Sequence, residues 1–113
     1  MLEYLNMNNL TRDDLQDLRQ QMDKVDRQII ELLKQRFLIT NKVGQYKKQE
    51  GLPAQDKARE KVQMARIEEL ASEAGLNPKL ATDLLRVIID EVIQNHLEIS
   101  KDTAKAKSWA SKM

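Results

Sequence analysis

The sequence predicts an all-α fold: three helices with one very long first helix, assembled as an intertwined homodimeric helical bundle. Three observations support this class. Helix-favouring residues fill long stretches, while Gly occurs only three times and Pro twice in 113 residues. Apolar residues recur three and four positions apart, as in a heptad pattern. Capping signals mark the ends of three segments, and the chain is long enough for one domain.

The first helix is predicted from about Arg12 to about Lys48. Thr11 precedes it as a candidate N-cap, and Gly51 with Pro53 ends it. At 1.5 Å per residue this helix is roughly 55 Å long, whereas a compact domain of this size has a radius of gyration of about 13 Å. A single chain cannot cover so long an apolar stripe, so a partner chain is expected. The stripe consists of Leu15, Leu18, Met22, Val25, Ile29, Leu32, Ile39, Val43 and Tyr46.

Two shorter helices follow. The second is predicted from near Asp56 to Ala74, with Gly75 just after its end. Asn77 and Pro78 form a cap and first-turn pair that starts a third helix running to about Ser100. We therefore divide the chain into an N-terminal extension (1–10), one domain (11–100) and a basic C-terminal tail (101–113), which contains Trp109 and is expected to fray.

The composition argues against several classes of function. Without cysteine and with one histidine, neither a disulfide framework nor a metal site is expected. The 19 Lys and Arg nearly balance the 18 Asp and Glu, so no global field attracts nucleic acid. No apolar run approaches the roughly 20 residues of a membrane helix, and the start of the chain lacks a leader pattern. We expect a cytoplasmic protein.

Arg36 interrupts the apolar stripe of the first helix, between Leu32 and Ile39. A guanidinium in such a position is costly unless it is paired with an anion. One interpretation is an ion pair with an acid of a neighbouring helix. The position of Lys47 favours a second interpretation, a binding site for an anion. Lys47 lies eleven residues after Arg36, which is within about 20° of arc and about 16 Å along the helix axis. Two long cations so placed leave a gap the size of a small dianion.

Arg19 lies seventeen residues before Arg36, which is about 26 Å away and about 100° around the helix. Within one chain it cannot serve the same pocket. If the long helices of two chains pack antiparallel, Arg19 of one chain meets Arg36 of the other, giving two equivalent sites under two-fold symmetry. The alternative is an ordinary surface residue.

Two further candidates have strong structural alternatives. Asp56, Arg59 and Glu60 share one face of the second helix, a pattern that also decorates exposed helices. Their position favours a site, because the preceding loop folds this face back toward Lys47. His96 lies in the apolar stripe of the third helix, where a lone histidine is more often part of a core than of a site.

Taken in order, these segments resemble the all-α chorismate mutase family over roughly Leu15 to Ile99. The segments that carry the resemblance read LRQQMDKVD at 18–26, LKQR at 33–36, VGQYK at 43–47, DKARE at 56–60 and LLRVIIDE at 84–91. The resemblance implies a cofactor-free enzyme that rearranges chorismate to prephenate in phenylalanine and tyrosine biosynthesis.

The resemblance also implies roles for the cations. Arg36 and, across the dimer interface, Arg19 would hold the two substrate carboxylates, and Arg59 would assist one of them. Lys47 would donate to the ether oxygen. Fixing both carboxylates favours the reactive conformer, and a cation beside the ether oxygen stabilises the negative charge that grows there. We therefore take Lys47, His96 and Arg36 as catalytic.

The remaining roles concern the far end of the pocket and the third helix. Asp56 and Glu60 would accept from the ring hydroxyl or shape that end. The family often has a small hydroxyl residue and then Gln or Glu where this sequence has Val92 and His96. That departure removes one hydrogen bond at Val92 and makes His96 the second ether-oxygen donor, from one nitrogen of its neutral ring or with added charge when protonated.

The sequence is also compatible with alternative functions. An isochorismate-pyruvate lyase or an aminodeoxychorismate mutase could use the same fold, and Asp56 with Glu60 favours a hydroxyl-bearing substrate. A non-catalytic helical dimerisation module would pair Arg36 and Lys47 with internal acids. Neither nucleic acid nor a membrane is expected as a partner. The tail from Lys101 could dock on another enzyme of the aromatic pathway.

Overall fold

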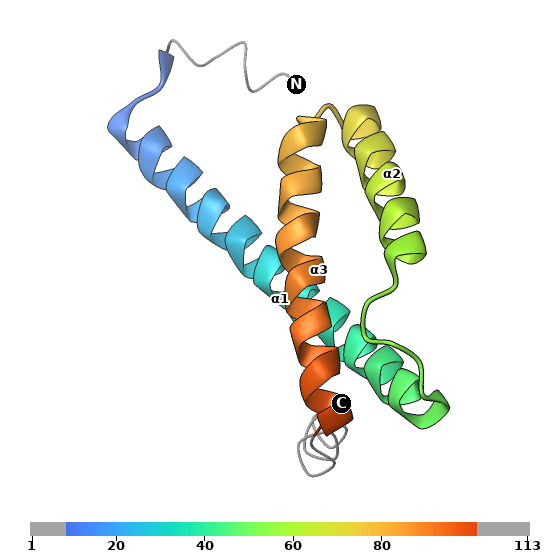
Figure 1. Cartoon of the computed structure of the whole chain (residues 1–113). Coiled ribbons are helices and arrows are strands. Elements are labelled where there is room, and N and C mark those ends of the chain that lie inside the picture. The colour runs from blue at the N-terminus through green and yellow to red at the C-terminus, as the bar shows by residue number, and fades with distance from the viewer. Residues whose placement is uncertain (1–8, 102–113) are drawn as a thin grey trace. The chain divides into compact units, whose positions relative to one another are not determined.

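The computed structural model describes residues 9–101, and these form three helices (Figure 1). Helix α1 spans Arg12–Glu50, α2 spans Lys57–Ala74 and α3 spans Pro78–Lys101. No strand occurs among the described residues. The predicted all-α class with a long first helix is confirmed. The extension and the tail, including Trp109, lie largely outside the described residues, so the predicted division of the chain stays a prediction.

The ends of α1 follow from local chemistry. The backbone N–H of Asp14 donates to Thr11 Oγ1 (3.2 Å), and the N–H of Thr11 donates to Asp14 Oδ2 (2.8 Å). This reciprocal arrangement is a capping box with Asp as its acid. At the other end, Gly51 has φ +65° and Leu52 N donates to Lys47 O (2.8 Å), which is the pattern of a Schellman motif. A residue that tolerates left-handed φ is needed there, so Gly51 stops the helix.

The ends of α2 and α3 were also predictable. Asp56 is the N-cap of α2, and its Oδ1 accepts from Arg59 N (3.0 Å). Gly75, with φ +75°, ends α2 in a second Schellman motif. Asn77 Oδ1 accepts from Lys79 N (3.0 Å), which caps α3 as expected.

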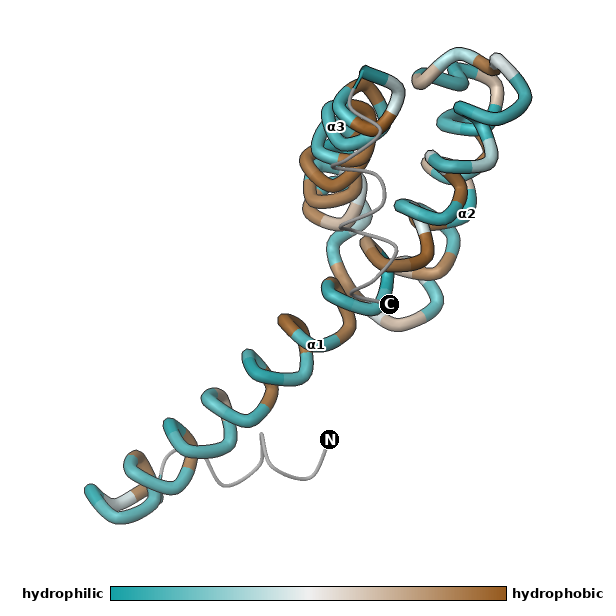
Figure 2. The backbone as a smooth tube through the Cα atoms, turned by 90° about the horizontal axis from the view of Figure 1, so that it is seen from below, coloured by the Kyte–Doolittle hydropathy of each residue, from teal (hydrophilic) through white to brown (hydrophobic). Residues whose placement is uncertain are grey.

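The chain divides into two compact units between Arg36 and Phe37. In the described part of the first unit, residues 9–36, the only long element is the first part of α1. Its apolar side chains are exposed: Met22 is 58% exposed and Ile30 64%. Figure 2, which colours the backbone by hydropathy, shows brown hydrophobic positions recurring between teal ones along α1. The first unit therefore has no core of its own among its described residues.

The second unit consists of the rest of α1 with α2 and α3. Helices α2 and α3 run antiparallel and pack against each other (Figure 1). Its buried side chains are Ala71, Leu85, Ile89, His96 and Ile99.

Gly44 on α1 is also buried in the second unit, against α3. A Cβ added at Gly44 would lie 2.5 Å from His96 Cδ2 and 3.1 Å from Ile99 Cδ1. Only glycine permits so close an approach of α3.

Candidate active site

Lys47 and His96, two of the predicted site residues, belong to the second unit. Lys47 lies in the last turn of α1, half-buried, and its Nζ donates to Ala54 O (3.1 Å) in the loop before α2. The loop therefore folds back toward Lys47, as the sequence predicted. The positive charge of Lys47 also lowers the pKa of His96, so the two groups share one electrostatic environment.

His96 is anchored to the backbone of α1. Its side chain is buried, and Nε2 lies 2.7 Å from Thr40 O. A carbonyl oxygen can only accept, so Nε2 carries a hydrogen and donates it. The carbonyl oxygen of Thr40 has two lone pairs, so it can accept from His96 in addition to a backbone hydrogen bond of the helix. Nδ1 is also buried and has no hydrogen-bond partner among the described residues.

The protonation state of His96 follows from these surroundings. Burial lowers its pKa below the ordinary value of 6.5, and Lys47 lowers it further. The carbonyls of Thr40 and Ala54 act in the opposite direction, Thr40 more strongly than Lys47, and the net pKa is lowered. The free protein therefore holds a neutral ring at pH 7. In that ring the only N–H donates to Thr40 O, and Nδ1 becomes a second donor only when it is protonated. The predicted donation from His96 to a substrate stays a prediction.

Glu60 connects α2 to α3. Its side chain is 13% exposed, and Oε1 accepts from Arg86 Nη1 (2.8 Å). Arg86 in turn donates from Nε and Nη2 to Asp90 Oδ1, at 3.0 and 2.7 Å. The hydrogen bond from Arg86 is the main cause that lowers the pKa of Glu60. Sequence reasoning gave Arg86 no role, although a basic residue inside an apolar stretch was a signal.

The other predicted residues of the second unit have more local surroundings. Asp56 and Arg59 are exposed at the start of α2, where Asp56 Oδ1 is engaged in the cap. Val92 is half-buried on α3. The roles predicted for these residues stay predictions.

Arg19 and Arg36 belong to the first unit, in the part of α1 before Phe37. The side chain of Arg19 is exposed. Their predicted role, gripping a ligand together with groups of the second unit, stays a prediction.

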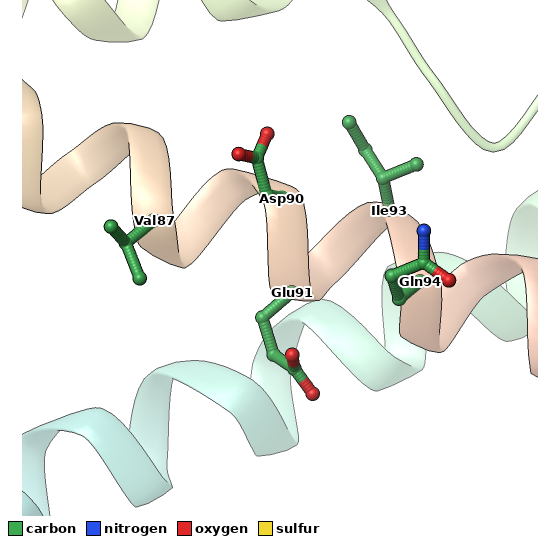
Figure 3. A pocket seen from close by; sticks show the side chains of 5 residues that line it. All are labelled: Val87, Asp90, Glu91, Ile93 and Gln94. Carbon is green, nitrogen blue, oxygen red and sulfur yellow. The ribbon is translucent and has the colours of Figure 1, made fainter.

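An open hollow of about 490 Å³ lies against α3, and five residues of that one helix line it (Figure 3). Ligand sites usually bury 70–90% of a ligand, which a single helix face does not do. The hollow would need a second wall to bind a small molecule. Its lining residues are Val87, Asp90, Glu91, Ile93 and Gln94.

Among residues 9–101, no helix is long and apolar enough to cross a membrane. Over the same range, no group of three or more His, Cys, Asp or Glu side chains is arranged to hold a metal ion.

Fold and site together define a class: an all-α protein with a long first helix, whose second unit combines a lysine, a buried histidine and an ion-paired glutamate. The chain belongs to the chorismate mutase type II family, whose model matches residues 18–97. That match includes every predicted site residue.

The curated relatives agree with the family. The chain is 37% identical over 83 residues to the T-protein of Haemophilus influenzae, a match covering 72% of this chain and 22% of that protein. It is 27% identical over 78 residues to the chorismate mutase of Methanocaldococcus jannaschii, covering 69% of this chain and 79% of that protein. A bifunctional chorismate mutase/prephenate dehydratase of Buchnera aphidicola is 26% identical over 83 residues, covering 74% and 22%. The chain thus spans about a fifth of the T-protein.

Proposed function

We propose that this protein is a chorismate mutase, an isomerase that converts chorismate to prephenate in the biosynthesis of phenylalanine and tyrosine. The observation that carries the proposal is the family match over residues 18–97. The relative from Methanocaldococcus jannaschii adds support, because this chain covers 79% of it and it is named a chorismate mutase. The buried, charged environment around Lys47 and His96 suits the chemistry.

The rearrangement breaks one carbon–oxygen bond and forms one carbon–carbon bond within a single molecule. It moves no proton and uses no nucleophile, so the protein contributes shape and charge. Arg36, with Arg19 of the partner subunit and Arg59, would hold the two carboxylates. Guanidinium groups bind carboxylates with a fixed, two-pronged geometry, and this orientation keeps the enolpyruvyl arm over the ring.

Lys47 would stabilise the transition state. As the carbon–oxygen bond breaks, negative charge grows on the ether oxygen, and a cation already in place lowers the energy of that state more than that of the substrate. In the free protein the Lys47 ammonium donates to Ala54 O, and an ammonium has two further N–H groups. His96 would add a second donor when protonated at Nδ1, while Nε2 stays bonded to Thr40.

The proposed enzyme is a homodimer in which each site uses both chains. The exposed apolar side chains of the first unit, from Leu15 to Leu32, support this arrangement, because burying apolar area stabilises by about 25 cal/mol per Å². A second copy of the chain supplies a matching stripe under two-fold symmetry. The open hollow on α3 likewise lacks a second wall.

The test is an assay of chorismate consumption with identification of the product. The proposal predicts prephenate as the product from chorismate. Pyruvate released from isochorismate would instead identify the lyase of the same fold, and preferential turnover of the amino analogue would identify an aminodeoxychorismate mutase. No turnover of any of the three, together with no thermal stabilisation by chorismate, would identify a non-catalytic dimerisation module. The cytoplasmic location and the docking of the tail on another enzyme of the pathway stay predictions.

A further inference from the structure

Arg86 is a charged residue of the second unit that has no role in the proposed mechanism. It lies on α3 between the buried Leu85 and the exposed Val87, and its side chain is 42% exposed. It donates one hydrogen bond to Glu60 Oε1 on α2 and two to Asp90 Oδ1, one turn further along α3. Asp90 therefore fixes the guanidinium, and the guanidinium fixes Glu60.

The two oxygens of Glu60 have different surroundings. Oε1 accepts from Arg86 at 2.8 Å, whereas Oε2 is buried and has no hydrogen-bond partner among the described residues. A buried acceptor left unpaired is unfavourable, and more so when it is charged. A ligand that brings a hydroxyl donor to Oε2 would remove that cost. Asp56, the other predicted acceptor, is exposed and already engaged in the cap of α2.

We infer that Arg86 is a positioning residue: it holds Glu60 by one carboxylate oxygen and leaves the other, Oε2, as a preorganised acceptor for the ring hydroxyl of the substrate. This inference rests on the proposed function. Arg86 does not itself touch the substrate. It acts by fixing the geometry of Glu60 and by keeping Glu60 ionised, so that its free oxygen accepts and does not donate.

The charges around Glu60 agree with this role. The hydrogen bond from Arg86 lowers the pKa of Glu60 below its ordinary 4.5 more than any other cause, and the Gln55 side chain and the charge of Arg86 add to the effect. Burial and the negative charge of Asp90 act in the opposite direction. Without Arg86, the balance shifts toward the protonated acid, which could donate from Oε2 and would no longer match a hydroxyl donor.

The test compares wild type with Arg86→Gln and Arg86→Lys, using chorismate as substrate and kcat/KM measured from pH 8 down to pH 4. At pH 7, Arg86→Gln should lower kcat/KM about tenfold, the scale of one hydrogen bond to a charged group. The acid side of its pH profile should move to higher pH, because Glu60 protonates more easily. Arg86→Lys keeps a positive charge beside Glu60, so it should retain the acid side of the wild-type profile while losing part of the activity.

Two controls separate positioning from mere stabilisation. Lys79→Gln removes another ion pair of α3, to Asp83 at 2.8 Å, and should change neither kcat/KM nor its pH profile. Asp90→Asn leaves the Glu60 contact of Arg86 and should have a smaller effect than Arg86→Gln, which also keeps the inference testable if Arg86→Gln does not fold. Melting temperatures show whether stability alone has changed.

The outcomes are distinct. A wild-type protein that makes no prephenate overturns the proposed function and this inference with it. An active wild type combined with a folded Arg86→Gln that keeps the wild-type kcat/KM and the wild-type acid limb overturns the inference alone. If Arg86→Gln does not fold, a pH profile unchanged in both Arg86→Lys and Asp90→Asn, with full activity, overturns it as well.

Discussion

The two units of the chain differ in what their side chains contact. In the described part of the first unit, apolar residues such as Met22 and Ile30 are exposed, and Thr11 and Asp14 form the hydrogen bonds of the helix cap. In the second unit, residues far apart in the sequence meet: Thr40 with His96, and Glu60 with Arg86. The described apolar side chains of the first unit are exposed, whereas the second unit has buried side chains and polar groups fixed by hydrogen bonds.

This difference suggests a division of labour. An uncovered apolar helix is suited to association with another chain, and fixed polar groups inside a core are suited to chemistry, because preorganised groups need no rearrangement as charge develops. On the proposed mechanism, Lys47 and His96 of the second unit act at the ether oxygen, and Arg19 of the first unit would complete the site of the partner subunit. The following predictions test one or the other half of this comparison.

The largest expected effect is that of Lys47→Ala in the second unit. Removing one donor to a developing oxyanion costs about 10²–10³ in kcat, so turnover should fall by at least about a hundredfold. The fold should be retained, because Lys47 lies near the end of α1. Steady-state kinetics with chorismate and circular dichroism measure both quantities. Lys42→Ala, on the exposed side of α1, is the control. A loss below about threefold, far short of that scale, would remove Lys47 from the mechanism.

Gly44→Ala tests the close packing of the second unit. The added Cβ would lie 2.5 Å from His96 Cδ2 and 3.0 Å from Nε2, so the ring must move. Overpacking costs about 1–3 kcal/mol, which exceeds the gain in helix propensity of about 1 kcal/mol. Urea titration should show a lower free energy of unfolding than for wild type and for Lys42→Ala. A variant at least as stable as wild type would show that α3 does not approach α1 so closely.

The sequence predicted the features that depend on local chemistry. Thr11, Gly75 and Asn77 place helix ends, because a cap or a left-handed turn involves residues only a few positions apart. Arg36 and Lys47 could be singled out because a cation stands out against an apolar pattern. The resemblance to the family could also be found from the sequence, because the family's motifs are short segments in a fixed order.

The features that the sequence did not predict depend on contacts between distant residues. Nothing near His96 indicates that its ring donates to a carbonyl 56 residues away, or that Gly44 makes room for it. Similarly, Arg86 meets Glu60 across 26 residues. Such pairs depend on how helices pack. A period of 3.6 residues shows which face of a helix is apolar, but it does not show which other helix packs against that face.

A smaller effect concerns the pH dependence of stability. The pKa of His96 is lowered in the folded protein from its ordinary 6.5, so the unfolded chain takes up the proton first as pH falls. The stability contributed by the neutral ring is therefore present above pH 6.5 and is lost as pH falls through the folded-state pKa. Urea unfolding between pH 8 and pH 5 should show this decline in wild type. His96→Gln keeps an N–H for Thr40 and should show less of it.

Protonation of His96 should raise turnover, although it lowers the stability of the fold. Protonation at Nδ1 adds a donor and a charge where negative charge develops, so kcat should rise modestly as pH falls through the pKa of His96 in the complex. His96→Gln should flatten this rise, and His96→Leu should abolish it and lower kcat. If wild type and His96→Leu agree within about twofold at every pH, His96 has only a structural role.

Arg19 of one chain is proposed to complete the site that contains Arg36 of the other chain, and mixing two inactive variants tests this sharing most directly. Arg19→Ala and Arg36→Ala should each disable both sites of their own homodimers. After subunit exchange, a heterodimer contains one site with both arginines intact, so an equal mixture should regain about a quarter of wild-type activity under two-fold symmetry. Subunit exchange is confirmed by mass spectrometry of the mixed dimer. A mixture in which heterodimers are present but activity stays at the level of the two parents would contradict the shared site.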